Sequence, residues 1–452
     1  MEEGEGEGEV AGRCRERLSR EERNAGWLAN TGNIQEPGYM FVLQEDGAAR
    51  SGLRLAGVSA NVTGSEWWRH ERPAEYLLGS DILAVFSDKC VEGVRALVRL
   101  HQRSSTSLDA CVHDPETVAA ADFCPFPESE PEFLTCSIAS SNPGMYLLEV
   151  ELKLGSQSAC QEGAPGLVQV AHVLRCLSSP AATPEVLTGA VCDSLMRSLP
   201  AYDHVMVYRF AADNSGEVIH ESTRPGSQES SSYLNLRFPA SDVPDPARKL
   251  LLLNRTRFVV DTRLEGAPLR VQLGADDEQG LDLSMSAFRA PVICHLRYLR
   301  NMGVRSSLSA AIAVDNELWG MFAFHSHKGA VCPTVEERTL VEMAASVTGM
   351  TLARHGRETT AKTSLALTNI LGKLSEHIRI QDFLSAQHRA LLDILGVDTI
   401  VLCEQARATT VYGEPALSLT PAECRDLLLD DRSDKTLSFW SEGGGRGVAF
   451  FS

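Results

Sequence analysis

The sequence predicts an α+β protein of tandem domains, each with an antiparallel sheet flanked by helices, and a long connecting helix. Three observations support this prediction. Short apolar stretches with alternating polarity are typical of half-buried strands. Amphipathic stretches with helical spacing lie between them. The chain has 452 residues, the length of about three domains of ordinary size.

The composition is that of a soluble globular protein and restricts its partners. Apolar residues make up 43% of the chain, charged residues 23%, and the formal net charge is −18. The acidic balance argues against nucleic acid or an anionic membrane as the main partner, because phosphate binding needs clustered Lys and Arg. The N-terminus lacks the basic and apolar parts of a signal peptide. Twelve cysteines without C-x-x-C pairs favour reduced thiols in a cytosolic protein.

The first third of the chain predicts a flexible segment and one small domain. Residues 1–30 begin with a Glu/Gly repeat, which buries too little apolar surface to fold. Residues 31–155 mix strand-like and helical patterns, as in a small α+β domain. The expected elements are strands over 39–43, 133–138 and 146–152, and helices near 76–103. Gly, Ser and Pro in 155–166 indicate a linker.

A second α+β domain is predicted over 165–355. It begins with one long helix over 170–199. Strands follow over 205–210, 216–222 and 257–261. A hairpin over 307–314 and 318–327 turns at Asp315 and Asn316, residue types that accept the left-handed conformation of tight hairpin turns.

A long helix and an incomplete third domain are expected over 356–452. Thr334, with Glu337 three residues later, forms a capping-box pattern. The helical pattern runs from there toward Ile378 and is weakly broken at Gly356. Such a helix bridges domains or pairs with a second copy. A helix over 382–395 and strands over 399–402 and 447–451 follow, which gives two or three strands in all.

A cysteine followed by a histidine is the most informative local feature. Cys294 and His295 lie inside the stretch 289–299. A thiol is suited to a thioether with a conjugated tetrapyrrole, and a neighbouring imidazole can bond ring nitrogens and exchange protons near neutral pH. The alternative is a small buried apolar cysteine. By contrast, His325, His327 and Cys332 match the spacing of no standard metal site.

Several further motifs make the sequence resemble the phytochromes. The photosensory core of that family consists of a PAS domain, a bilin-binding GAF domain and a PHY domain of GAF-like fold. The motifs are 202–210 with 216–219, 238–244 (an Asp-Ile-Pro motif with Val243 in place of Ile), 298–304 and 318–321. The stretch 33–35 resembles the N-terminal segment that threads through a GAF loop as a figure-of-eight knot. The resemblance covers roughly 30–452 and assigns 31–155 to PAS, 165–355 to GAF and 356–452 to the connecting helix and an incomplete PHY domain.

The resemblance implies a covalently bound linear tetrapyrrole, similar to phycocyanobilin or phytochromobilin. Cys294 would be the attachment point, and His295 would lie near the ring nitrogens. Asp242, with Val243 and Pro244, would face the pyrrole N–H groups. The alternative for Asp242 is a helix N-cap for 244–253.

The remaining contacts to the tetrapyrrole also come from the resemblance. Arg257 and Arg289 match two arginines that bind propionates, and the guanidinium fork suits a carboxylate. Ser307 and Ser309 would donate to the other propionate. Ring D would be enclosed by aromatic side chains and bonded by a histidine: Tyr208, Phe238, Tyr298 and His325.

The sequence also departs from the family pattern. Biliverdin-binding bacterial members attach their pigment through a cysteine just before the Ile-Gln motif, where this chain has Arg23. Cys14 lies nine residues too early. Glu36-Pro37 replaces the usual Pro-His. The sequence ends at Ser452 without a Pro-Arg-x-Ser-Phe motif, from which we expect an open pocket and a short-lived far-red state.

The function expected from these motifs is red/far-red light sensing without catalytic turnover. Light would isomerise the bridge between rings C and D, and the connecting helix would carry the change. The expected partners are the bilin, a second copy bound through the GAF and connecting helices, and an undefined downstream protein. Two alternatives stay open. One is a chromophore-free PAS–GAF module that dimerises or binds a small metabolite such as a cyclic nucleotide. The other is an enzyme regulator whose output domain is separate.

Overall fold

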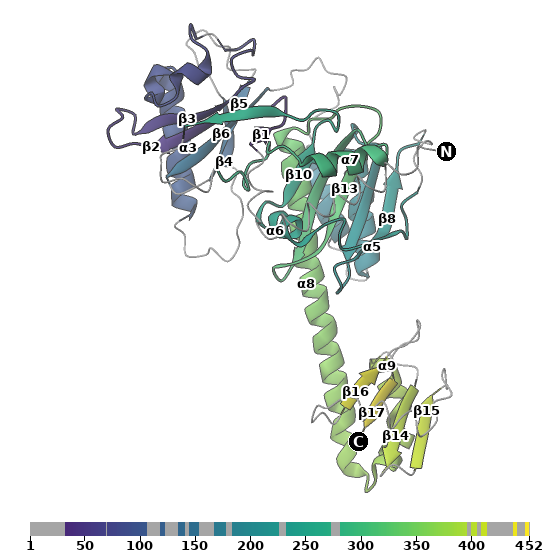
Figure 1. The fold of residues 1–452 in the computed structure, drawn as a ribbon. Helices are drawn as coiled ribbons and strands as arrows, with labels where there is room; N and C mark the ends of the chain where they lie inside the picture. The colour runs from purple at the N-terminus through teal and green to yellow at the C-terminus, as the bar shows by residue number, and fades with distance from the viewer. Residues whose placement is uncertain are drawn as a thin grey trace. The chain divides into compact units, whose positions relative to one another are not determined.

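The computed structural model describes most of the chain in two compact units, residues 1–352 and 353–452 (Figure 1). The described residues are 32–68, 70–105, 118–122, 134–140, 144–152, 167–177, 183–225, 232–272, 281–395, 399–404, 408–413, 437–440 and 448–451. The predicted N-terminal segment, the predicted linker over 155–166, Cys14 and Arg23 lie outside these residues.

The first sheet of the first unit has seven strands in the order β1-β11-β3-β2-β6-β5-β4. Their bounds are β1 Asn33–Ile34, β2 Tyr39–Glu45, β3 Leu53–Ser59, β4 Val118–Asp122, β5 Leu134–Ser140, β6 Met145–Leu152 and β11 Ala267–Val271. Helix α3 (Asp88–Ser105) and the short 3-10 helices η1 (Ala74–Leu77) and η2 (Ile82–Ala84) pack on it. The apolar side of α3, from Val91 to Val98, shares a buried cluster with Phe41 and Leu148.

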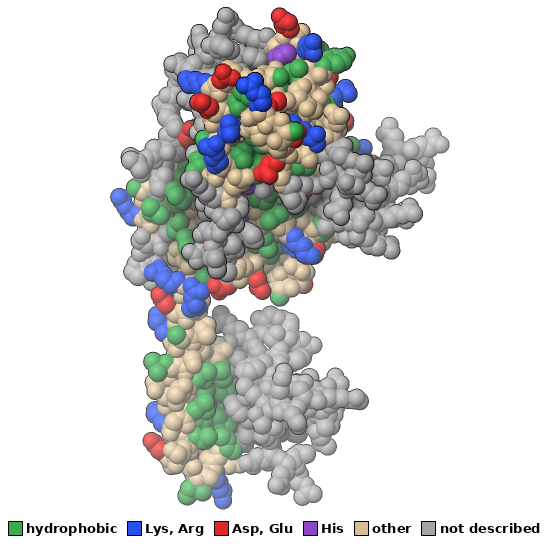
Figure 2. Space-filling view, turned by 90° about the vertical axis from the view of Figure 1, so that its left-hand side faces the viewer, with side chains coloured by type: hydrophobic (Ala, Val, Ile, Leu, Met, Phe, Trp, Pro, Cys, Tyr) green, Lys and Arg blue, Asp and Glu red, His purple; other side chains and the backbone are tan. Residues whose placement is uncertain are grey.

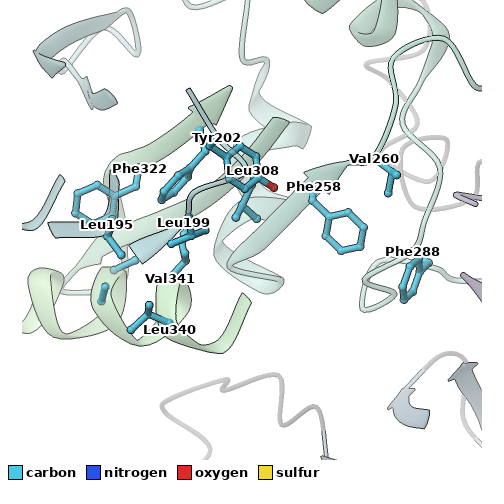
Figure 3. Packing of buried hydrophobic residues seen from close by; sticks show 14 of the residues in the cluster. Leu195, Leu199, Tyr202, Phe258, Val260, Phe288, Leu308, Phe322, Leu340 and Val341 are labelled. Carbon is cyan, nitrogen blue, oxygen red and sulfur yellow. The ribbon is translucent and has the colours of Figure 1, made fainter. Parts of the chain in front are cut away.

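The second sheet has six strands in the order β10-β12-β13-β7-β8-β9. Their bounds are β7 His204–Phe210, β8 Gly216–Thr223, β9 Arg237–Phe238, β10 Thr256–Val259, β12 Ser306–Val314 and β13 Glu317–Ser326. Helices α4 (Leu167–Leu177), α5 (Pro184–Ser198) and α8 (Val335–Gly372) contribute to the buried cluster on one face. In Figure 3, Leu195 of α5, Phe322 of β13 and Val341 of α8 lie together in this core.

Two predictions for this region have different outcomes. The single helix predicted over 170–199 is wrong, because two helices occupy that stretch. Pro184 is the first residue of α5, and the Thr183 side chain caps it by accepting from Val186 N. Proline starts a helix well but cannot continue one. The hairpin is confirmed: Asp315 and Asn316 have φ of 49° and 67°, as a tight turn of this type requires.

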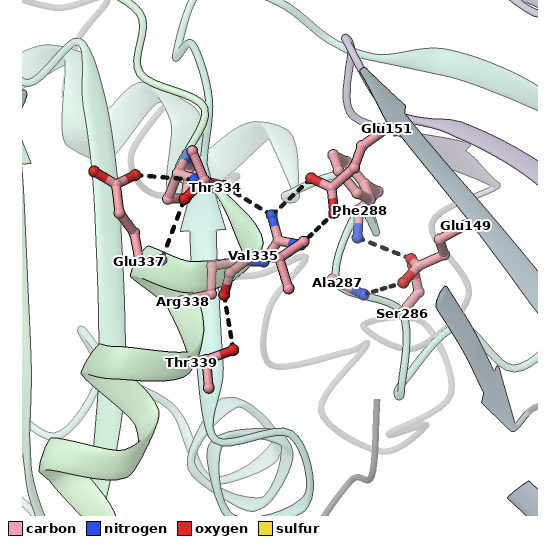
Figure 4. A network of polar contacts seen from close by, with 11 residues as sticks. Glu149, Glu151, Ser286, Ala287, Phe288, Thr334, Val335, Glu337, Arg338 and Thr339 are labelled. Atoms are coloured by element: carbon pink, nitrogen blue, oxygen red, sulfur yellow. Dashed lines mark hydrogen bonds and ion pairs between the residues drawn. The ribbon is translucent and has the colours of Figure 1, made fainter. Parts of the chain in front are cut away.

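The capping box at the start of α8 is also confirmed (Figure 4). Thr334 N donates to Glu337 Oε2 at 2.9 Å, and Glu337 N donates to Thr334 Oγ1 at 3.2 Å. The helix runs unbroken through Gly356 and ends at Gly372, before the predicted end near Ile378. A 3-10 helix, η3 (Lys373–Glu376), follows.

The second unit contains a four-stranded sheet, so the prediction of two or three strands is wrong. The order is β15-β14-β17-β16, with bounds β14 Thr399–Glu404, β15 Ala408–Gly413, β16 Leu437–Trp440 and β17 Val448–Phe451. The two strands that were missed, β15 and β16, lie at the edges of the sheet. They are defined by pairing with the neighbouring strands rather than by a local sequence pattern. Helix α9 (Ile380–Leu395) packs on it through Phe383 and Leu391.

Apolar side chains reach the surface along α8 and the turn after it (Figure 2). Met350 is 62% exposed, Leu365 64% and Ile378 fully exposed. None of the described helices is long and apolar enough to cross a lipid bilayer.

The seven-stranded sheet takes two strands from distant parts of the chain. Strand β11, from within the GAF-like region, pairs with β3, and β1 pairs with β11 through Asn33↔Pro268 and Ile34↔Ala267. Gly266, at φ +89°, leaves room for this crossing, because a Cβ there would lie 2.4 Å from Ile34 O. The two α+β parts of the first unit are therefore joined by main-chain hydrogen bonds.

Gln35 strengthens this crossing. Its side-chain amide donates to Phe258 O at 2.9 Å and Arg289 O at 3.3 Å, and its oxygen accepts from Val260 N at 3.0 Å. Its backbone N donates to Phe288 O at 2.7 Å. The segment predicted to thread is thus held between two stretches of the GAF-like region.

A buried polar network adds side-chain contacts between the same parts (Figure 4). Arg338, in the first turn of α8, forms two bonds to the Glu151 carboxylate of β6, at 2.7 and 3.1 Å. Its guanidinium also lies over the Phe258 and Phe288 rings, 5.3 and 5.7 Å from their centroids. Nearby, the Glu149 carboxylate accepts from Ser286 Oγ at 2.6 Å and from two backbone N–H groups.

Candidate chromophore site

The six-stranded sheet has a second face that carries most of the predicted site. Strand residues alternate between faces. Val205, Leu308 and Phe324, with every second residue along the same strands, point into the buried core. The opposite face therefore carries His204, Met206 and Tyr208 of β7, Ser307 and Ser309 of β12, and Met321, Ala323 and His325 of β13. Met206, Tyr208, Met321 and Ala323 form a separate apolar cluster there with Tyr233 and Phe238.

Helix α7 (Ile293–Asn301) brings the predicted attachment residue to this region. Cys294 is half-buried in its first turn. One turn later, Tyr298 Oη donates to Asp242 Oδ2 at 3.2 Å. Desolvation and the Asp242 charge both raise the pKa of Tyr298, which keeps the phenol protonated and able to donate.

His295 lies next to Tyr298, with parallel rings whose centroids are 6.5 Å apart. The residue is exposed to solvent, and the Tyr298 ring covers one side of its imidazole. Desolvation, with the positive charge of Arg257 as a smaller cause, lowers its pKa to about 4. His295 is therefore neutral at pH 7 and can donate or accept a hydrogen bond.

Arg257 and Arg289 form a positively charged pair. Arg257 donates to the backbone oxygens of Ala287, at 3.5 Å, and Arg289. Desolvation and then the neighbouring Arg289 charge lower the pKa of Arg257; desolvation lowers that of Arg289 to about 10. Among the described residues, no carboxylate lies within ion-pair distance of Arg257. An anionic ligand group would relieve this repulsion, so the pair fits a carboxylate.

His325 is buried, with 6% of its surface exposed. Within the described part of the chain neither ring nitrogen has a hydrogen-bond partner, and Nδ1 is fully buried. Desolvation, followed by the charges of neighbouring histidines, lowers its pKa to about 3. A buried polar group without a partner costs about 1–3 kcal/mol. A ligand carbonyl or N–H would satisfy it.

The other predicted residues lie on the same side of the sheet. Ser309 Oγ donates to Arg257 O at 3.2 Å, and Ser307 lies opposite His325 in the β12–β13 register. The Tyr208 and Phe238 ring centroids are 5.8 Å apart. Desolvation raises the pKa of Tyr208 to about 12, with the Asp242 charge as a smaller cause.

The alternative role of Asp242 as a helix cap is wrong. Helix α6 (Asp245–Leu253) has Pro244 at its N-cap position and no side-chain capping bond. The Val243 carbonyl instead accepts from Arg248 Nη1 at 2.5 Å. An open hollow of about 390 Å³ lies at this turn, lined by Ala240, Ser241, Pro244, Asp245, Pro246 and Arg248.

Sequence reasoning missed two residues of this face. His204 lies opposite His325 in the β7–β13 register, and Tyr233 packs against both, with its ring centroid 5.1 and 6.2 Å from theirs. The alternation of β7, which places positions 204, 206 and 208 on one face, could have identified His204.

The comparisons with known proteins agree with this geometry. A GAF-domain family model matches residues 184–352. The chain is 42% identical over 149 residues to a bacteriophytochrome of Pseudomonas aeruginosa, a match that covers 32% of this chain and 20% of that protein. It is 28% identical over 284 residues to cyanobacterial phytochrome B of Nostoc, covering 62% and 37%. The chain is related to the phytochromes. These matches span little more than a third, at most, of the relatives' length.

The fold relationship extends further than the sequence matches. The photosensory core module of the Stigmatella aurantiaca phytochrome superposes with a TM-score of 0.68 at 26% identity, covering 91% of this chain and 76% of that one. The predicted fold class, tandem PAS and GAF domains followed by a long helix and a PHY-like domain, is thus confirmed. The phytochrome relationship also favours the light-sensing prediction over the chromophore-free alternative.

Proposed function

We propose that this chain is the light-sensing part of a red/far-red photoreceptor and binds a linear tetrapyrrole covalently through Cys294. The observation that supports this most strongly is a set of three groups in one region. Among the described residues, Arg257 has no carboxylate within ion-pair distance and His325 has no hydrogen-bond partner. Cys294 lies on the adjacent helix. A bilin has carboxylates, a ring carbonyl and an electrophilic side chain, which match these three groups.

Each residue has a role that its surroundings support. Arg257 and Arg289 would bind propionates, with Ser307 and Ser309 as further donors. His295, neutral at pH 7, would bond the ring nitrogens together with Asp242, Val243 and Pro244. Tyr208, Phe238 and Tyr298 would pack against ring D, and His325 would bond its carbonyl. When bound, the bilin supplies red-light absorption and a double bond that isomerises.

Attachment would require no leaving group. The Cys294 sulfur would add across the exocyclic double bond of ring A and form one S–C bond, while the thiol proton would pass to the neighbouring carbon. A bilin with an ethylidene side chain, such as phycocyanobilin or phytochromobilin, would supply that double bond.

Signalling would pass through α8, which starts beside the sheet and carries exposed apolar side chains. We propose that two copies associate along this helix and the GAF helices, since Met350 and Leu365 are both more than half exposed. The chain would bind and signal, with catalysis left to a separate partner or domain.

The test is co-expression with enzymes that make phycocyanobilin, followed by absorption spectra before and after red light. Denaturing electrophoresis with zinc should show a fluorescent band for the wild type and none for Cys294→Ala. Cys176→Ala is the matched control, because Cys176 is also a half-buried cysteine on a helix. If the wild type shows no red-absorbing adduct, or Cys294→Ala keeps the band, the proposal is wrong.

A further inference from the structure

Three histidine rings meet at the end of the site-bearing sheet face. The centroids of His204, His325 and His327 are each 6.3 Å from one another. In the part of the chain that the structure describes, no group of side chains is arranged to hold a metal ion. Imidazole is the side chain that takes up and releases protons near neutral pH.

Two of these rings are paired with buried carboxylates. His204 Nε2 lies 2.8 Å from Glu221 Oε1, with side-chain exposures of 1% and 8%. His327 Nδ1 lies 2.8 Å from Asp203 Oδ1, with exposures of 20% and 4%. A carboxylate at this distance favours the charged imidazolium.

Both carboxylates are fixed by further donors. Glu221 Oε2 accepts from Ser232 Oγ, Tyr233 N and Leu234 N, at 2.8 to 2.9 Å. Asp203 Oδ2 accepts from His327 N at 3.1 Å. Neither carboxylate can swing toward His325 without breaking these bonds.

His325 differs from both neighbours. Within the described residues it has no carboxylate partner and no hydrogen bond. The groups that face it are His204 from β7, His327 from the end of β13, His295 from α7 and Tyr233, while β12 offers only Ser307. Each neighbouring histidine becomes a cation when it is protonated, so none of them can stabilise a proton on His325.

We infer that the paired rings of His204 and His327 oppose a proton on His325 and so keep the His325 ring neutral down to acid pH. A proton on either paired ring is compensated by its own carboxylate, and its field then opposes a proton on His325. Burial of His204 works against its own protonation and lowers its pKa, but Glu221 opposes that effect.

The consequence for binding depends on the proposed function. A neutral imidazole can accept or donate a hydrogen bond, whereas an imidazolium can only donate. His204 and His327 are then positioning residues. They keep the His325 ring neutral, so that it can bond either a donor or an acceptor of ring D as that ring rotates.

The test uses the protein without bilin, labelled with carbon-13 histidine, and follows each ring by NMR from pH 3 to 9. His325 should stay neutral to a lower pH than an ordinary histidine does. His204→Gln leaves the Glu221 charge uncompensated and should raise the pKa of His325 by roughly one to two units. His327→Gln, at a more exposed site, should shift it in the same direction if His204→Gln does not fold.

His220→Gln is the matched control. His220 also pairs with a carboxylate, Asp193, at 3.1 Å, but no ring contact joins it to His325. This variant should leave the titration of His325 unchanged. If His325 takes up a proton in the ordinary histidine range, or if its pKa in the folded His204→Gln and His327→Gln variants equals that in the wild type, the inference is overturned. Neither result depends on whether bilin binds, so the two proposals can fail separately.

Discussion

Removal of the Arg338 charge should destabilise the first unit strongly. In Arg338→Met, the Glu151 carboxylate stays buried without its partner; the two side chains are only 11% and 12% exposed. Breaking a buried pair in this way costs about 3–5 kcal/mol. The lost contact of the guanidinium with Phe258 and Phe288 is largely replaced, because a methionine sulfur beside aromatic rings contributes roughly 0.3–1.5 kcal/mol.

The double variant distinguishes the cause. Arg338→Met with Glu151→Met removes both charges, and apolar replacement of a whole buried pair is often neutral or stabilising. Only the bond from Arg338 to Pro333 O, at 2.7 Å, is then lost without replacement, a cost of about 1–3 kcal/mol. The double variant should therefore be clearly more stable than Arg338→Met alone.

Urea unfolding followed by near-ultraviolet circular dichroism measures these differences. Arg209→Met is the control, because its pair with Glu185 is exposed, at 37% and 50%, and should contribute less than about 1 kcal/mol. If the double variant is as unstable as Arg338→Met, the uncompensated Glu151 carboxylate does not cause the destabilisation. The cause is then the loss of packing around Arg338.

Three further predictions concern pH and packing. His325 is harder to protonate when folded, with a pKa of about 3, so its contribution to stability should be lost as pH falls below about 6.5; the urea midpoint of His325→Gln should depend less on pH between 6.5 and 4. The contribution of Glu149 to stability changes with pH in the opposite direction. Burial raises its pKa, so the wild type should gain stability relative to Glu149→Gln as pH falls through this raised pKa toward the ordinary glutamate value of about 4.3. Gly349→Ala should destabilise the first unit by about 1–3 kcal/mol in thermal unfolding, because its Cβ would lie 2.1 Å from Ala313 O. An unchanged midpoint of thermal unfolding would show that α8 can move away from Ala313 without loss of stability.

Local patterns predicted the elements whose structure depends on neighbours in sequence. The Asp315–Asn316 turn and the Thr334 cap are set by residues within four positions of one another, and both are present. The break before Pro184 was missed although Pro180 and the Thr183–Pro184 pair mark it in the sequence. Strand β11 was missed because its partners lie in another domain.

The residues of the site also fall into those that a local pattern indicates and those that depend on distant parts of the chain. Motif residues such as Cys294 and Asp242 could be named from the sequence, because the resemblance assigns each a place. For His204 the alternation of β7 indicates only the face on which it lies; its importance depends on two strand pairings that bring Glu221 and His325 beside it. Histidine at one strand position has no distinctive pattern of its own.

The exchange of strands between the two parts of the first unit has a consequence for synthesis on the ribosome. Gln35 bonds to Phe258 O, 223 residues later in the chain. At about 5–20 residues per second, that partner is made roughly 10–45 s after Gln35. Throughout that interval the edge of β3 that will receive β11 is an open strand edge, the kind of surface on which chains aggregate. A chaperone that occupies the nascent chain until residue 271 has emerged should therefore raise the yield of folded protein more than one that acts after release.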